Sequence, residues 1–134
     1  MGKHTVWPGV WDKALRFALL FHSKCPQGDH FDLVLELKRG QRLWTLKMST
    51  NPLATDSPKL TIHGFIRRRY LTFQGDIGRG RGMVQQIASG SYTISIRQKL
   101  PVLTFHIGEK DSILYFVEQV DQKTLQLLRS RPIN

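Results

Sequence analysis

The sequence of 134 residues has one cysteine, few acidic residues and no long apolar run. The single thiol, Cys25, excludes an internal disulfide bond and is typical of a reducing compartment. The longest apolar run, residues 17–21, is far shorter than the ~18 residues of a transmembrane helix, and no small-residue cleavage site follows it. We therefore expect a soluble, cytoplasmic protein.

Acidic residues are outnumbered two to one by basic residues. Ten aspartates and glutamates face 20 lysines and arginines, and the formal net charge is +10. A surplus of this size favours a polyanionic partner, most simply nucleic acid, although a basic surface that serves only solubility is the alternative. No segment joins a basic face to a continuous apolar helical face, which disfavours a membrane surface as the partner.

Helical patterns are almost absent, and short apolar segments alternate with turn residues instead. Many short strands at this spacing predict a mainly antiparallel all-β fold, a barrel or a sandwich, in one domain over residues 17–130. An arm, residues 1–16, precedes it, with a short helical turn near residues 11–17 and with Trp7 and Trp11 pinned onto the body. Residues 131–134 form a tail. We expect strands at residues 16–22, 30–37, 42–48, 60–66, 83–88, 92–100, 103–107, 113–120 and 124–128, with 70–73 extended.

Residues 30–37 alternate strictly with a period of two, the pattern of a half-buried strand. Four apolar side chains share one face, and His30, Asp32, Val34 and Glu36 share the other. His30 and Asp32 lie about 7 Å apart along such a strand, a span that suits one cation held by both. The alternative is an ordinary amphipathic strand whose polar face meets water. A tight turn at residues 39–40 is expected to pair this strand with residues 42–48.

This strand resembles the His-x-Asp-x-Arg-x-Glu strand of the 3′-phosphoesterase domain of bacterial DNA ligase D, which trims the 3′ ends of broken DNA before end-joining. The resemblance continues in order over residues 17–130 and implies a small β-barrel with a groove on one side. The further matching segments are Trp44, residues 70–75, the Gly-rich loop 75–82, Gly82 with Val84, Gly90 and Tyr92, residues 103–108 and residues 125–129.

The resemblance implies a divalent cation, usually manganese, held by His22, His30 and Asp32. Imidazole and carboxylate ligands together suit manganese or another transition metal, which would polarise a phosphoryl oxygen. His63, Tyr70 and Glu36 are the candidate catalytic residues. For Glu36, support of a basic neighbour is the alternative role. For His63 and Tyr70, a structural role is the alternative.

Two positions depart from the family pattern, and both correspond to residues that would bind the phosphate rather than the metal. Val34 stands where the family has an arginine, so a bidentate phosphate clamp is missing. Ile66 stands where the family has a histidine. His63 lies three residues earlier and could take that place only if its strand were shifted or bulged.

Basic residues cluster in two places. Three consecutive arginines at the end of a strand can fan along a phosphate backbone, and neighbouring glycines allow close approach of the main chain. A merely solvated charged loop is the alternative. The candidate nucleic-acid-binding residues are Arg67, Arg68, Arg69, Arg79, Arg81 and Lys47.

Three functions follow from these observations. The first is a metal-dependent phosphoesterase, a monomer that acts on DNA or RNA-containing 3′ ends in repair and end-joining. The second is a non-catalytic nucleic-acid-binding barrel that has lost the phosphate pocket. The third is an interaction module that offers its aromatic N-terminal arm to a DNA ligase or another end-joining partner.

Overall fold

A computed structural model describes residues 15–38, 40–109 and 111–130 of the chain. Strands dominate these residues, as the all-β prediction requires, and two short 3₁₀ helices interrupt them. No helix in these three ranges has the length and apolar character needed to cross a membrane. The elements are β1 (Leu15–Ser23), β2 (His30–Glu36), β3 (Leu43–Met48), η1 (Pro52–Ala54), β4 (Lys59–Ile66), η2 (Arg68–Leu71), β5 (Gly75–Asp76), β6 (Met83–Arg97), β7 (Leu100–Ile107), β8 (Asp111–Asp121) and β9 (Thr124–Arg129).

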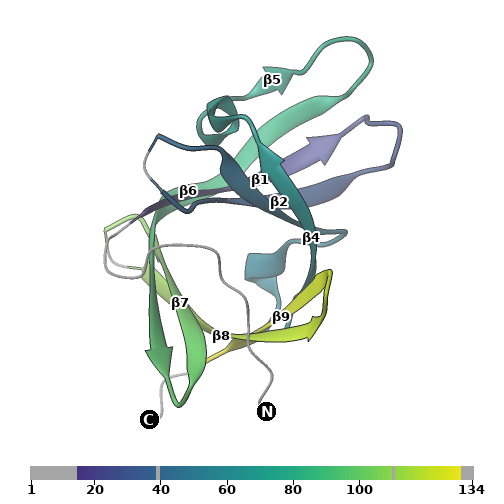
Figure 1. Cartoon of the computed structure of the whole chain (residues 1–134). Coiled ribbons are helices and arrows are strands. Elements are labelled where there is room, and N and C mark those ends of the chain that lie inside the picture. Colours follow the sequence, from purple (N-terminus) through teal and green to yellow (C-terminus); the bar gives the residue numbers. More distant parts are fainter. Residues whose placement is uncertain (1–14, 39, 110, 131–134) are drawn as a thin grey trace.

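Eight of the strands close into an antiparallel barrel. They follow the order β1-β2-β3-β4-β9-β8-β7-β6, and β6 pairs back onto β1. The two-residue β5 pairs with the first residues of β6, on the edge that β7 occupies further along. Figure 1 shows β5 at one end of the molecule, away from β7, β8 and β9. The predicted barrel and the pairing of β2 with β3 are therefore confirmed.

One long strand replaces the two strands expected at residues 83–88 and 92–100. β6 runs unbroken for 15 residues, so the predicted break at Ser89 and Gly90 is wrong. Gly90 pairs with Phe17 of β1 on one side and with Ile107 of β7 on the other. A Cβ atom there would lie 2.1 Å from the carbonyl oxygen of His106. Gly90 thus permits a close approach of strands within the barrel wall instead of ending β6.

The hairpin between β6 and β7 turns before the position expected from the sequence. Gln98 and Lys99 both have positive φ, 52° and 68°, as a tight primed turn requires. Pro101 was expected to separate the strands, but it lies inside β7 and pairs with Ile96.

The inward faces of the strands fill the barrel. Phe31, Leu33, Leu35 and Leu37 all turn inward, as their alternation predicts. Phe17 packs edge-on against Phe105 at 4.8 Å. The largest fully buried side chains of this core are Tyr92, Tyr115, Phe17, Phe105, Leu19, Leu33, Leu35, Leu46, Leu60 and Leu103.

A second apolar cluster lies on the outer face of the barrel wall. Ala18, Leu20 and Val34 are each at most 1% exposed, and Leu71 of η2 packs with them. The partly buried Phe73 and Ile77 extend this cover along residues 72–82. Residues 70–73 were expected to be extended, but η2 takes up 68–71. This part of the second face of β2 is therefore covered by protein, not by water.

Several predictions about the ends of the domain lie outside the described residues. These are the placement of Trp7 and Trp11, most of the helical turn expected near residues 11–17, and the tail 131–134. The turn expected at residues 39–40 includes residue 39, which is also outside them. The strand expected from residue 16 begins one residue earlier, at Leu15, so residues 15–17 of the expected helical turn lie in β1 instead.

Candidate metal and phosphate site

The candidate ligands meet because the end of β1 pairs with the start of β2. His22 pairs across the strands with His30, and Leu20 pairs with Asp32. On the other side of β2, Asp32 pairs with Lys47 of β3. Cross-strand partners lie on the same face of a sheet, so these side chains share the outer face. They open onto a pocket of about 440 Å³, with lining residues Leu20, His22, Pro26, Gln27, His30, Asp32, Thr45, Lys47, His63, Ile66, Tyr70, Ile77, Arg81 and Val84.

His63 reaches this pocket through a β-bulge. Thr45 of β3 pairs with Gly64, but the next residue, Leu46, pairs with Ile62. His63 is therefore the extra residue of β4, and Gly64 beside it has a φ of 122°. His63 was expected to enter the site only if its strand were shifted or bulged, and β4 is bulged at this residue. Ile66 lines the same pocket three residues later.

Backbone carbonyls fix the protonated nitrogen of both histidines. His30 Nδ1 lies 3.0 Å from the carbonyl oxygen of Gly28, and His22 Nε2 lies 2.9 Å from that of Arg81. A carbonyl only accepts, so each of these nitrogens carries a hydrogen. The other nitrogens, His30 Nε2 and His22 Nδ1, are left as the atoms through which these histidines would bind a metal. Metal-binding histidines are commonly oriented by this kind of contact.

Both of these nitrogens face the Asp32 carboxylate. His30 Nε2 lies 3.3 Å from Asp32 Oδ1, and His22 Nδ1 lies 3.9 Å from Oδ2. His30 Nε2 and Asp32 Oδ1 are buried, and neither has a hydrogen-bond partner among the described residues. A buried imidazole nitrogen and a carboxylate oxygen in this contact need a proton or a cation between them. The donor set of two imidazoles and one carboxylate fits manganese or zinc.

Gly82 lets the segment that carries Arg81 approach His22 closely. It has a φ of 110°, and a Cβ atom would lie 2.4 Å from the Ser23 carbonyl oxygen and 3.0 Å from His22 Nε2. Any larger residue would displace the carbonyl that orients His22.

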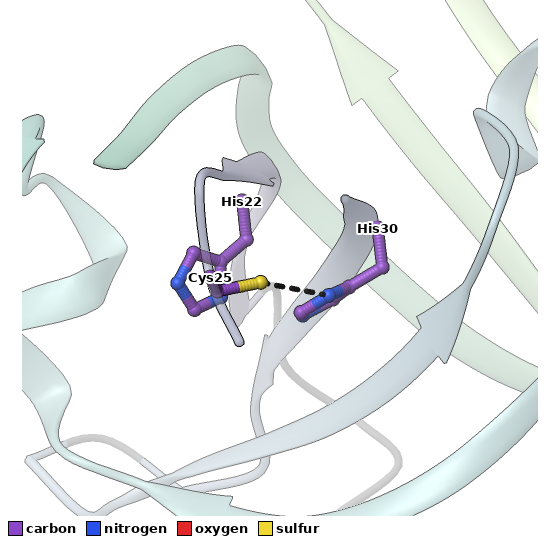
Figure 2. Close-up of side chains that lie close together, drawn as sticks. All are labelled: His22, Cys25 and His30. Atoms are coloured by element: carbon purple, nitrogen blue, oxygen red, sulfur yellow. Dashed lines mark hydrogen bonds between the residues drawn. The ribbon is translucent and has the colours of Figure 1, made fainter. Parts of the chain in front are cut away.

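Cys25 lies on the opposite side of His30 and was not expected to join the site. Its thiol donates to the Gly28 carbonyl at 2.8 Å, and Sγ lies 3.8 Å from His30 Nδ1. Figure 2 shows the sulfur pointing toward the His30 ring. His22, Cys25 and His30 offer ligand atoms within 4.8 Å of one another, a second donor set that favours zinc. That set would use His30 Nδ1, which already donates to Gly28, whereas the Asp32 set keeps this hydrogen bond.

Two basic side chains stand beside the metal ligands. Desolvation in the pocket, the Lys47 ammonium and His30 together lower the pKa of His63 below its ordinary 6.5, against the opposing pull of Asp32. His63 is consequently neutral at pH 7. Lys47 supplies the fixed positive charge next to Asp32.

The structure brings seven of the predicted site residues together and leaves others apart. The pocket contains His22, His30, Asp32, Lys47, His63, Tyr70 and Arg81. Arg67 and Arg69 line an adjoining groove of about 300 Å³ together with Arg42, which sequence reasoning missed. Arg79 lines a separate hollow of about 270 Å³ near Lys24.

Glu36, Arg68 and Val34 do not line the pocket. Glu36 is 2% exposed and forms an ion pair with Arg68. It lies four residues, roughly 13 Å, along β2 from Asp32. Val34 is fully buried in the outer cluster. The position that matches the family's arginine thus lies under the cover formed by η2.

No protein-family model matches this sequence, and no curated protein matches it significantly. Function is therefore inferred from the residues and geometry described above.

Proposed function

We propose that this protein is a divalent-metal-dependent phosphoesterase of the ligase D 3′-phosphoesterase type, which removes phosphate from the 3′ ends of nucleic acids. One observation carries the proposal: two oriented imidazoles face one carboxylate in an open pocket beside a lysine, and the buried His30 Nε2 and Asp32 Oδ1 have no hydrogen-bond partner among the described residues.

The cation would be held by His22 Nδ1, His30 Nε2 and the Asp32 carboxylate. Three protein ligands leave coordination positions open, as a catalytic site requires. When bound, the metal would polarise a phosphoryl oxygen and neutralise part of the phosphate charge. Lys47 adds a second positive charge at the same phosphate.

Three other pocket residues have roles in this scheme. Neutral His63 accepts a proton from the water that attacks phosphorus, while the bond to the 3′ oxygen breaks and that oxygen takes up a proton. Tyr70 donates a hydrogen bond to a phosphate oxygen. Arg81, whose Nε and Nη2 donate to the carbonyls of Gly78 and Ile77, offers its remaining Nη1 donors to the phosphate.

A non-catalytic nucleic-acid-binding barrel is the second candidate. The buried Val34 and the apolar Ile66 favour it, because both stand where the related enzymes have phosphate-binding side chains. The third candidate, an interaction module, depends on the N-terminal arm, which lies outside the described residues.

The test is a 5′-labelled primer annealed to a template and ending in a 3′-phosphate, incubated with Mn²⁺. We expect phosphate release by the wild type and a loss of at least about 100-fold in His30→Ala and in Asp32→Asn. His106→Ala is the matched control, since it removes a partly exposed imidazole, in contact with Ser112, on β7 outside the pocket. Activity that survives both pocket variants refutes the metal site. No release with any divalent cation, despite metal binding, favours the binding-only candidate.

A further inference from the structure

Phe65 is an exposed aromatic side chain between two hollows at the end of β4. Its exposed fraction is 52%. It lines the arginine groove with Arg42, Arg67 and Arg69, and it also lines a second hollow of about 410 Å³ with Lys38 and Arg42. A large apolar ring left in water among cations has no evident role in folding.

The arginine groove adjoins the metal pocket. Ile66, Tyr70 and Arg81 line both. A chain that leaves the pocket past these residues therefore meets the arginines next and Phe65 with them. The shared lining residues therefore place one end of the groove next to the proposed metal site.

The charges of the groove are all of one sign. No acidic residue appears among the described residues that line either hollow. Arg69 is held in place, because its guanidinium lies 4.3 Å from the centre of the Phe73 ring and 5.4 Å from that of Tyr70. A row of arginines is complementary to a phosphodiester backbone.

We propose that this groove binds single-stranded nucleic acid, with an unpaired base stacked on Phe65 and its phosphates along Arg42, Arg67 and Arg69. An exposed aromatic ring next to a positively charged groove is the arrangement by which proteins hold single strands. In an intact duplex the base faces are covered by their neighbours, so Phe65 would have no partner. The inference rests on the proposed function in one respect, since it places the 3′ end in the metal pocket and makes a single-stranded 3′ end the preferred substrate.

The test measures binding of labelled single-stranded DNA, single-stranded RNA and blunt duplex by fluorescence anisotropy in EDTA, so that no metal contributes. We expect both single strands to bind more tightly than the duplex, and Phe65→Ala to weaken single-strand binding by about tenfold. Ile96→Ala is the matched control, since Ile96 is 61% exposed on β6 and lies outside the groove. Phe65→Trp should retain binding, and its added fluorescence should be quenched when a base stacks on it.

Wild-type affinity in Phe65→Ala, or equal affinity for duplex and single strands, would overturn the inference. A preference for DNA or for RNA that depends on Phe65 supports the inference and shows which of the two nucleic acids the groove binds. Because the binding measurement is made in EDTA, a failure to release phosphate in the activity assay would not count against the proposed single-strand binding. Conversely, phosphate release that does not depend on Phe65 would remove this subsite and leave the proposed function standing.

Discussion

Arg68 forms an ion pair with Oε2 of Glu36, whose side chain is 2% exposed at the end of β2. The other carboxylate oxygen accepts a hydrogen bond from the backbone N–H of Arg16 at 3.1 Å. The pair ties η2 to the barrel wall and so holds the cover over the outer cluster. It also occupies one of the three consecutive arginines that the sequence offers to nucleic acid.

Loss of the Arg68 side chain should destabilise the fold. In Arg68→Ala, Glu36 keeps a buried carboxylate without its cation, and we expect the free energy of unfolding to fall by about 2 kcal/mol, less than for a fully buried pair because Arg68 is partly exposed. Urea denaturation measures the change. Arg67→Ala, an exposed neighbour, should change stability by less than about 0.5 kcal/mol. Equal stability of the two variants would show that the ion pair does not secure η2.

Because Arg68 is paired with Glu36, it should not contribute to the salt dependence of nucleic-acid affinity as Arg67 and Arg69 do. The Arg67→Ala, Arg69→Ala double variant should flatten the slope of log affinity for single-stranded DNA against log salt by about 1.4 units, near 0.7 for each phosphate that is no longer neutralised. Arg68→Ala should leave the slope unchanged while it lowers stability. A flatter slope in Arg68→Ala would mean that Arg68 leaves Glu36 to bind phosphate.

The strand of residues 30–37 and the barrel could be predicted because alternation and turn residues are local signals. His30 and Asp32 lie on one face wherever that strand is placed. His22 joins them through the pairing of β1 with β2, which the resemblance anticipated. The role of His63 depends on a bulge, and a bulge is set by the register between β3 and β4, which no local pattern reveals.

The remaining features depend on packing between distant segments. Alternation places Val34 on the polar side of β2 and cannot show that Leu71 and Ile77 cover it. The groove likewise joins Arg42 of one hairpin to Phe65 and Arg69 of another segment. Cys25 offered a local signal, since it stands between His22 and His30 at ligand-like spacing, but its thiol was considered for disulfide formation and not as a metal ligand.

Gly82 should matter for metal binding although it offers no ligand. In Gly82→Ala, the added methyl group collides with the Ser23 carbonyl and with His22 Nε2, so His22 is no longer oriented by the Arg81 carbonyl. We expect Mn²⁺ affinity, measured by calorimetry, to fall at least about tenfold. Gly80→Ala is the control, because Gly80 also has a positive φ, 70°, but its Cβ would meet nothing within 4 Å. Equal affinities in the two variants would contradict this role.

The rate of phosphate release should fall at acidic pH. The pKa of His63 is lowered below 6.5 by desolvation and by Lys47, so its neutral, proton-accepting form persists to lower pH than in a free imidazole. We expect kcat/KM to decline only below pH 6.5. The His63→Gln variant should have a lower rate, and its kcat/KM should no longer show this decline at acidic pH. A rate that rises as pH falls through this range would instead assign His63 a role as a cation.

We expect His22 Nδ1, His30 Nε2 and the Asp32 carboxylate to bind one divalent cation. An anomalous difference map from a manganese-soaked crystal tests it most directly, with an Asp32→Asn crystal soaked in parallel. We predict a single peak in contact with all three residues, absent or much weaker in Asp32→Asn. A wild-type map without that peak, or with a peak at Cys25 and His30 Nδ1 away from Asp32, would contradict the claim.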